Sequence, residues 1–480
     1  MKRIVNCKNL AFIIAAFTLL SLGSCKKYLD EPLPAGTISN ANAFNSDNSV
    51  SSVVTGNFEN ILNAGVFGGS YSQNLEYSTG LYTDELINLN TTNTTSIAFY
   101  TNAIATDPGW WQNSYNQVYG VNAALTGIET TTAQLYYKNQ WLGESYFSRA
   151  LLYFYLTNLY GAVPVSLTTD VTTNDQLPRT AQTQVYQQIV SDLKQAQGLL
   201  NGGYTDAYGA STSSRVRPNR YAALALLAKV YLYTQKWDSA EMEADSVITN
   251  SIYALAPLTS AFTSNSTETI WALSTPTNTA EFEYGFYVNG MPNPMVSPNT
   301  PTTYQVYACL DTNLVNTFEP GDNRLADWVR TVPVTGSSPA LTYYFPYKYN
   351  SSALGGQNQM VLRLGETYLI RAEARAEQGE LSGAQSDLNA VRTRAGLGAT
   401  TATDEPGLLS AIAHERRVEL FTEGGNRFFD LKRTGKIDSV MGAFAPVKGG
   451  TWSDYMQLFP LPINDLQQDA NLTQNPGYTN

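Results

Sequence analysis

Two segments of this chain, separated by more than 100 residues, repeat one pattern of small and apolar residues. Both follow the 3.6-residue period of a helix with a break in the middle, so each segment predicts two helices joined by a turn. Such a pair leaves an apolar face that only a neighbouring pair can cover, so we expect the two segments to pack together. The positions are Ala228, Tyr231, Trp237, Ala240, Ala244 and Val247 in residues 219–249, and Ala372, Gly379, Ala384 and Val391 in residues 365–395.

The spacing within both segments is that of the tetratricopeptide (TPR) repeat, in which helix pairs stack into a superhelix. Two unrelated helical hairpins are the alternative interpretation. Further amphipathic stretches extend the pattern, one of them ending at the breakers Gly161 and Pro164. The sequence therefore predicts a mainly α chain, a TPR-like scaffold of helix pairs forming an α-α superhelix, with long irregular loops and minor β structure. The pairs are expected near residues 138–200, 219–250, 363–396 and 407–433.

Two long segments, near residues 40–115 and 253–356, interrupt the helical pattern. Both are rich in Pro, Thr, Asn and aromatic residues, and the second contains a short β-like run at Thr269–Leu273. Long irregular insertions in a compact domain usually carry function, so we interpret both as loop-rich binding insertions over one face of the scaffold. Trp237, at a repeat packing position, and Trp271, in the β-like run, are expected in the core.

The N-terminus has the features of an export signal. Lys2, Arg3 and Lys8 form a positive region, and Leu10–Leu22 is an apolar stretch of 13 residues. This stretch is shorter than the about 20 residues of a membrane-spanning helix and fits the apolar part of a signal peptide. The sequence Leu22-Gly23-Ser24-Cys25 resembles the lipobox of bacterial lipoproteins, where a peptidase cuts before the cysteine and its sulfur carries a diacylglycerol. An ordinary secretory signal with a chance cysteine is the alternative.

We therefore predict a lipoprotein signal peptide over residues 1–24, lipidation at Cys25 and a single mature domain over residues 25–480. Cys7 would leave with the signal, so Cys309 would be the one remaining thiol and no disulfide framework is expected. The mature protein would sit on a membrane through its lipid, since no other stretch reaches 18 apolar residues.

Charge and composition exclude several functions. The chain has 40 acidic against 29 basic residues, a net charge of −11, and no basic run, which argues against nucleic-acid binding. A single histidine makes most histidine-based metal sites and catalytic triads impossible, and we assign no cofactor and no metal. Only 14% of the residues are charged, so the surface must be built from hydroxyl, amide and tyrosine side chains. Such a surface suits hydrogen bonding and stacking with neutral oligomers.

The densest charges lie in residues 413–436. Glu415 and Glu419 stand one helical turn apart, and two carboxyls about 5 to 10 Å apart across a cleft could hydrolyse a glycoside. The alternative is a structural block, in which opposite charges three and four residues apart compensate each other. The sequence shows neither a cleft nor a cause for a raised pKa here, so no catalytic residue is assigned, and His414 is interpreted as solvated or capping.

Six sequence blocks follow one another between Cys25 and the C-terminus. They are Cys25-Lys-Lys-Tyr-Leu-Asp30 with Pro32; Arg149-Ala150 leading to Tyr160-Gly161 and Pro164; Arg363-Leu-Gly-Glu-Thr-Tyr-Leu-Ile-Arg-Ala-Glu-Ala374; Asn389-Ala-Val-Arg-Thr-Arg-Ala-Gly396; Glu415-Arg416-Arg417-Val-Glu419-Leu to Asp430-Leu-Lys-Arg433; and Leu458-Phe-Pro-Leu-Pro462 with Gln474-Asn-Pro-Gly477. In this order they resemble the SusD/RagB family, the surface nutrient-binding lipoproteins of Gram-negative bacteria that degrade polymers.

The resemblance implies a single, mainly α-helical domain, lipid-anchored in the outer membrane and facing the cell surface. Its partner would be a SusC-like TonB-dependent transporter, over which the protein sits as a lid. It would bind an oligomer, most simply a glycan, and deliver it to the barrel. A peptide-binding lid of the same system, a surface glycoside hydrolase and a TPR scaffold for other surface proteins are the alternatives.

Ligand binding is expected at aromatic residues, because sugar rings lie flat on Trp or Tyr faces while amide and acidic side chains bind their hydroxyls. Glycan binders of the family that this chain resembles use a Trp and an Asn in a place comparable to Trp110 and Asn113. The alternative is that Trp110 or Trp111 only packs against the helix that follows. The candidates are Trp110, Asn113, Asp84 and Tyr82, with Tyr284 and Tyr287 as an opposing wall.

Overall fold

The computed structural model describes residues 40–68, 70, 73–276 and 279–479. The chain divides into two units, residues 1–43 and 44–480. Of the first unit only the short helix α2 (Asn40–Ala43) is described, so the predicted signal segment and Cys25 lie outside the described residues. Across the described ranges, no helix combines the length and the apolar character that crossing a bilayer requires.

The second unit is built mainly from helices, which make up 52% of the structure against 8% for strands. Its helices are α3 (Asp47–Asn63), α4 (Leu75–Tyr82), α5 (Thr94–Tyr100), α6 (Trp110–Thr130), α7 (Lys138–Tyr160), α8 (Val171–Asn174), α9 (Gln182–Leu199), α10 (Arg220–Tyr233), α11 (Trp237–Ile248), α12 (Phe282–Tyr287), α13 (Thr312–Val315), α14 (Arg324–Asp327), α15 (Leu364–Glu377), α16 (Leu381–Arg394), α17 (Glu405–Glu419), α18 (Asn426–Arg433), α19 (Ile437–Phe444) and α20 (Ile463–Gln468), with 3-10 turns at Gly65–Phe67, Leu258–Ser260, Pro301–Tyr304, Ala445–Lys448 and Asp454–Gln457.

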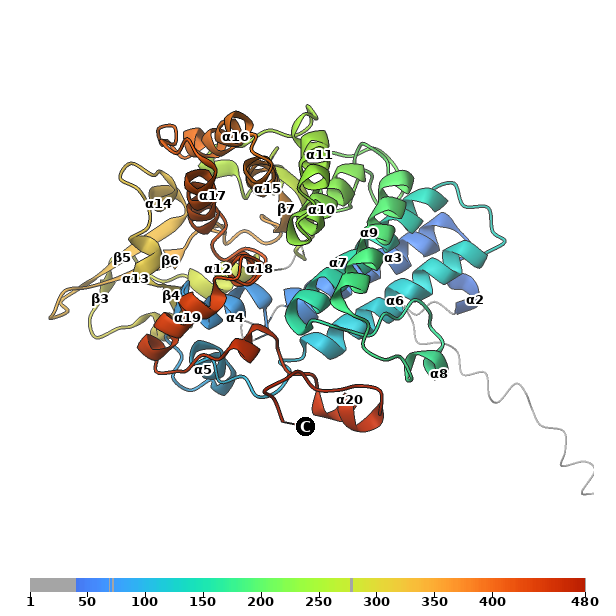
Figure 1. The fold of residues 1–480 in the computed structure, drawn as a ribbon, viewed down its shortest axis with the longest axis horizontal. Helices are drawn as coiled ribbons and strands as arrows, with labels where there is room; N and C mark the ends of the chain where they lie inside the picture. The colour runs from blue at the N-terminus through green and yellow to red at the C-terminus, as the bar shows by residue number, and fades with distance from the viewer. Residues whose placement is uncertain (1–39, 69, 71–72, 277–278, 480) are drawn as a thin grey trace, which may run out of the picture. The chain divides into compact units, whose positions relative to one another are not determined.

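The long helices stack in chain order, each against the next. Helix α6 packs on α7, α7 on α9, α9 on α10 and α10 on α11 (Figure 1). Helix α11 then packs on α15, although more than 100 residues separate them, and α15 packs on α16 and α17. The prediction of a mainly helical, TPR-like scaffold is confirmed.

The contact between the two repeat segments depends on small side chains. Ala240 and Ala244 of α11 are buried against Ala374 of α15, together with Leu232 and Ile370. Alanine at these positions lets the two helix backbones approach closely, which is how stacked repeats exclude water from a narrow interface.

Residues 40–115 differ from the expected irregular segment, because most of them are helical. The Ser and Asn residues that suggested loops are helix caps: the side chains of Ser46, Asn74 and Asn93 accept hydrogen bonds from the first turns of α3, α4 and α5. Helix α3 then buries one face, which includes Val54 and Phe58, in the core. Capping and burial together outweigh the low helix propensity of this segment.

Within the described residues, seven short strands form three small sheets. They are β1 (Leu86–Asn88), β2 (Thr269–Leu273), β3 (Met295–Val296), β4 (Ala308–Leu310), β5 (Val329–Thr335), β6 (Leu341–Pro346) and β7 (Gln359–Arg363), paired as β1-β4, β2-β7 and β3-β5-β6. Strand β2 coincides with the β-like run of the sequence, all five of its residues are buried, and Trp271 lies in the core as predicted. Its antiparallel partner β7 leads directly into α15.

Candidate functional site

Trp110 and Tyr82 lie in the interior, around the same two phenylalanines. Trp110 begins α6 with 0% of its surface exposed, and its ring contacts Phe99 and Phe459. Tyr82 ends α4, contacts the same two rings and donates its hydroxyl to the carbonyl of Met456 at 3.0 Å. Neither ring has a free face for a sugar in this structure, which favours the packing role that the sequence also allowed for Trp110.

Asn113 and Asp84 are engaged by other protein groups. The Asn113 amide donates to the carbonyl of Gly109 one turn earlier, at 2.8 Å. Asp84 accepts two hydrogen bonds from Arg427 and one from Arg417, at 2.7 to 2.8 Å. Burial opposes ionisation of this carboxyl, but the hydrogen bond and the charges of the two arginines outweigh burial and lower its pKa. Asp84 is therefore an ion-paired carboxylate.

Tyr284 and Tyr287 stand one turn apart on α12. Tyr287 is buried and stacks on Tyr77 of α4 with ring centroids 6.0 Å apart, whereas Tyr284 is half-buried. The structure thus gathers Trp110 and Tyr82 in one aromatic cluster and places Tyr287 against α4. A role in ligand binding stays a prediction for all six candidate residues.

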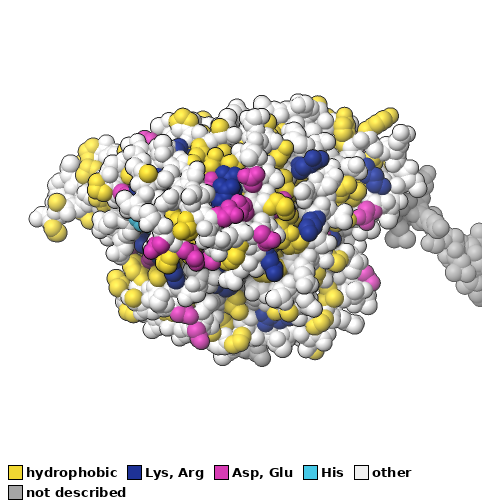
Figure 2. All heavy atoms as spheres, turned by 45° about the horizontal axis from the view of Figure 1, so that its top comes forward, with side chains coloured by type: hydrophobic (Ala, Val, Ile, Leu, Met, Phe, Trp, Pro, Cys, Tyr) yellow, Lys and Arg dark blue, Asp and Glu magenta, His cyan; other side chains and the backbone are white. Residues whose placement is uncertain are grey.

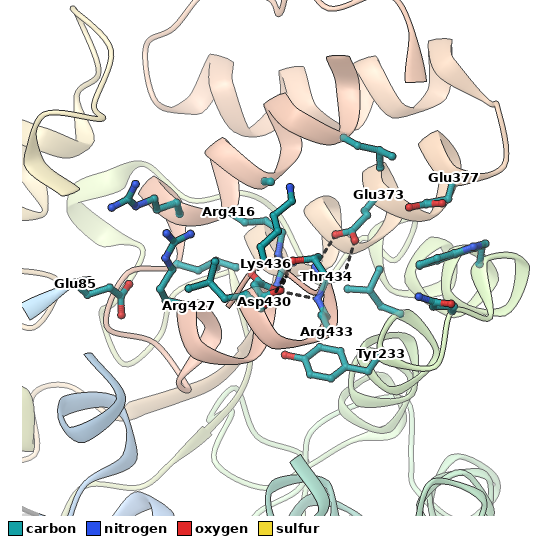
Figure 3. A pocket seen from close by; sticks show the side chains of 18 residues that line it. Glu85, Tyr233, Glu373, Glu377, Arg416, Arg427, Asp430, Arg433, Thr434 and Lys436 are labelled. Carbon is teal, nitrogen blue, oxygen red and sulfur yellow. Dashed lines mark hydrogen bonds and ion pairs between the residues drawn. The ribbon is translucent and has the colours of Figure 1, made fainter. Parts of the chain in front are cut away.

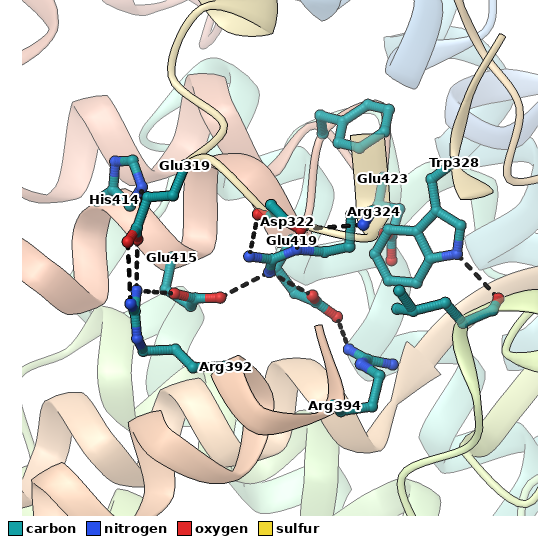
Figure 4. Close-up of polar contacts among 12 residues, drawn as sticks. Glu319, Asp322, Arg324, Trp328, Arg392, Arg394, His414, Glu415, Glu419 and Glu423 are labelled. Atoms are coloured by element: carbon teal, nitrogen blue, oxygen red, sulfur yellow. Dashed lines mark hydrogen bonds and ion pairs between the residues drawn. The ribbon is translucent and has the colours of Figure 1, made fainter. Parts of the chain in front are cut away.

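Glu415 and Glu419 lie inside the protein and do not face each other across a cleft. Both are fully buried, and Nη1 of Arg324 lies 2.6 Å from Glu415 and 2.8 Å from Glu419 (Figure 4). Burial opposes ionisation of Glu419, but the charges of Arg394, Arg363 and Arg324 lower its pKa, while burial raises the pKa of Glu415. The two carboxyls lack the open space between them that glycoside hydrolysis needs.

The partners of these two glutamates correct the sequence-based interpretation of residues 413–436. Compensation three and four residues along the chain occurs for Asp430 and Arg433, 2.8 Å apart. The charges of Glu415 and Glu419 are balanced instead by arginines from α14, α16 and the end of β7. The block is therefore structural, as the alternative interpretation proposed, but contacts between residues distant in sequence stabilise it.

Charged side chains are scattered over the face shown in Figure 2, and basic and acidic side chains lie together in one group near its centre. A charged pocket of about 330 Å³ opens between α11, α15, α17 and α18 (Figure 3). Several charged side chains that line it are paired with each other: Arg433 contacts both Glu373 and Asp430 within 2.8 Å. Trp237, predicted in the core, is half-buried on the wall of this pocket. The pairing leaves the pocket without a strong preference for either sign of charge.

A second pocket, which we call the aromatic cleft, has a volume of about 390 Å³ and lies between α6, α8 and α20. Trp111, Tyr115 and Tyr119 line it, and their four-residue spacing places all three on one face of α6. The other walls carry acidic, amide and aliphatic side chains, namely Val171, Asn174, Asp175 and Leu177 near α8 and Asp465, Gln468, Asp469 and Leu472 near α20.

Hydrogen bonds join the walls of the aromatic cleft. The Trp111 indole donates to Asp465 at 2.9 Å, and the Tyr115 hydroxyl donates to the carbonyl of Pro164 at 2.7 Å. Asn471, after α20, donates to the carbonyl of Gln176, after α8, at 3.1 Å. Sequence reasoning missed this cleft because α8 and α20 lie about 290 residues apart, although the four-residue aromatic spacing was visible.

Comparisons with known proteins agree with this fold. The SusD family model matches residues 182–478, and a second family model, starch-binding associating with outer membrane, matches residues 43–232. SusD-like protein P38 of Formosa agariphila is 24% identical over 418 residues, which cover 77% of this chain and 79% of that protein.

Solved structures share the fold over most of its length. A laminarin binding SusD-like protein matches with a TM-score of 0.71 and 24% identity, over 89% of this chain and 99% of that chain. Surface glycan-binding protein A from Bacteroides fluxus matches with a TM-score of 0.71 and 21% identity, over 90% of this chain and 99% of that chain. Because the SusD family model spans more than half of its residues, this chain belongs to the SusD family.

Proposed function

We propose that this protein captures an oligomeric glycan at the cell surface and delivers it to a SusC-like TonB-dependent transporter, which it covers as a lid. The observation that carries the proposal is the SusD family match over residues 182–478. Two structures of the same fold are described as laminarin binding and as surface glycan-binding, which supports a glycan as the ligand class.

The same proposal places the protein on the outer membrane, held by a lipid on Cys25. The N-terminal family model describes proteins that associate with the outer membrane, and the lipobox-like sequence before Cys25 supplies the anchor. A lid must stay beside its transporter while it opens and closes, and a lipid anchor keeps it at the membrane surface during that motion.

We further propose that the protein binds without catalysis. A glycosidase needs two carboxyls on either side of a bound sugar, one of them positioned to donate a proton. Glu415 and Glu419, the pair singled out from the sequence, are buried and ion-paired with arginines. The two similar structures are described as laminarin binding and as surface glycan-binding proteins, which supports the same conclusion.

An affinity panel tests this function. We expect saturable binding of the purified mature protein to at least one neutral polysaccharide, for example laminarin or soluble starch, without release of reducing sugar. Pull-down from membranes should recover mainly one large barrel protein. Release of reducing sugar, recovery of many unrelated partners, or binding of peptides alone would each contradict the proposal.

A further inference from the structure

The aromatic cleft contains a row of rings that runs from a closed end to an open end. Four residues advance a helix by about 6 Å, so Trp111, Tyr115 and Tyr119 follow one another along the same face of α6. Trp111 is only 2% exposed, Tyr115 is half-buried and Tyr119 is 49% exposed. The row therefore offers more ring surface toward the mouth of the cleft.

The inner rings are held in place by their polar ends. Trp111 is fixed by Asp465 and Tyr115 by the carbonyl of Pro164, and the two ring centroids are 4.9 Å apart. Rings that are already ordered lose little conformational entropy when a ligand stacks on them, which favours binding. This part of α6 thus forms a preorganised apolar wall.

The opposite walls carry polar groups that have no protein partner. In the described part of the chain, the side chains of Asp175 and Gln468 on these walls make no hydrogen bond, and Asp465 uses only one carboxylate oxygen, toward Trp111; Asn116, on α6 itself, is equally free of hydrogen bonds. Asn174, by contrast, is committed to Ser166 and Thr168. The uncommitted amides and carboxylates accept hydrogen bonds, and hydroxyl groups donate them.

The charge of the cleft restricts the ligand further. Its ionisable lining residues are Asp175, Asp465, Asp469, Tyr115 and Tyr119, and neither lysine nor arginine is among the described residues that line it. Carboxylates that line a cleft repel uronate or sulfate groups, whereas neutral hydroxyls bind carboxylates well. A volume of about 390 Å³ is within the usual range of small-ligand sites, about 300–1,000 Å³.

We propose that the aromatic cleft between α6, α8 and α20 is a binding site for a neutral oligosaccharide, with Tyr119 as the open stacking platform and Asp175 and Asp465 as hydroxyl acceptors. This inference rests on the proposed function, since it places the glycan at a defined site. The site would bind neutral oligosaccharides in preference to uronate-containing or sulfated ones.

Substitution of Tyr119 tests the stacking role. Tyr119→Ala should weaken binding of laminarin or soluble starch, whichever the wild type binds, by about tenfold or more, while Tyr119→Phe keeps the ring and most of the affinity. Tyr136→Ala is the matched control, because Tyr136 is 82% exposed and does not line the cleft. Tyr119 is half exposed, so melting temperatures should stay unchanged in all three variants.

A second measurement tests the charge argument. Polygalacturonate, an anionic polysaccharide, should not bind the wild type, and Asp175→Asn should weaken binding of the neutral glycan several-fold. If the wild type and Tyr119→Ala bind a neutral glycan with equal affinity, the aromatic cleft is not the binding site. The proposed function would still hold in that case. A wild type that binds none of these neutral glycans, or binds only cationic peptides in the cleft, would count against the inference and the proposed function together.

Discussion

Arg324 is surrounded by three carboxylates, and none of its surface is exposed. The side chain contacts Asp322 through two nitrogens and shares Nη1 between Glu415 and Glu419 (Figure 4). A single buried charge without a partner destabilises a protein far more than a buried ion pair does, so each of these groups depends on the others. In a chain with few charged residues, many of these residues therefore serve to hold the interior together.

Arg324→Met should destabilise the protein by about 3–5 kcal/mol, because it leaves buried carboxylates unpaired. Urea unfolding monitored by circular dichroism measures the free energy of unfolding. Arg220→Met is the control, since Arg220 is exposed at the start of α10 and should change stability by about 0.5 kcal/mol or less. Equal effects of the two substitutions would show that the buried network contributes little.

Trp110→Ala decides between the two roles that the sequence allowed for Trp110. The ring is buried against Phe99 and Phe459, so its removal should cost about 3–5 kcal/mol of stability. Affinity for the bound glycan, measured by calorimetry below the lowered melting temperature, should stay the same. Lost affinity at unchanged stability would instead establish the stacking role.

At the scale of elements, α12 is held by carboxyl groups that resist ionisation. Glu281 caps the helix by accepting a hydrogen bond from the backbone of Glu283 at 2.7 Å. Burial, and then the charge of Glu76, raise the pKa of Glu281 to about 8. Burial likewise raises the pKa values of Glu76 and Glu283. The short helix that carries Tyr284 and Tyr287 is thus capped by a carboxyl, Glu281, that is largely protonated at neutral pH.

This anchoring makes stability depend on pH in a defined direction. The unfolded carboxyl ionises near pH 4.5 and the folded one near pH 8, so the stabilisation by Glu281 is complete below about pH 4.5 and is lost as the pH rises through about 8. Glu281→Gln keeps the capping oxygen and cannot ionise. When the pH rises from 5 to 8.5, the wild type should lose unfolding free energy that Glu281→Gln keeps. The difference between the two losses should be at least about 1 kcal/mol, which corresponds to about one pKa unit.

Unfolding free energies at several pH values test this prediction. Glu59→Gln on α3, an exposed carboxyl, is the control and should follow the wild-type profile. Parallel profiles for Glu281→Gln and the wild type would contradict a protonated Glu281.

The helix pairs could be predicted from the sequence because local periodicity and small residues at α11 and α15 specify them. The contacts of Glu419 could not, because Arg324, Arg363 and Arg394 reach it from three separate elements. The residues that cap α3, α4 and α5 looked like loop residues, since serine and asparagine favour both settings. The aromatic cleft could not be predicted for a similar reason, because its walls come together only in the folded chain.

At the scale of the whole molecule, charge and anchoring act together. Removal of residues 1–24 takes away Lys2, Arg3 and Lys8, which leaves 26 basic against 40 acidic residues and a net charge of −14. A negatively charged protein gains no attraction from the anionic surface of a membrane, so the proposed anchoring would depend on the lipid at Cys25.

Cys25→Ala should therefore release the protein from membranes into the soluble fraction. Fractionation of cells, followed by immunoblotting of both fractions, measures the distribution, and Cys309→Ala is the matched control because Cys309 is buried far along the chain in β4. Continued tight membrane association of Cys25→Ala would contradict the predicted anchor.

The pairing of β2 with β7 has a consequence for how such proteins diversify. Leu273 and Gln359 face each other in this antiparallel pair, so the two ends of residues 274–358 lie side by side, while β4 within the segment pairs with β1. A segment with adjacent ends can be exchanged as a cassette without moving the junction with α15, provided that the incoming segment again supplies a partner for Glu415 and Glu419, as Arg324 does here. Recombination between relatives could therefore supply new surfaces on one unchanged superhelix.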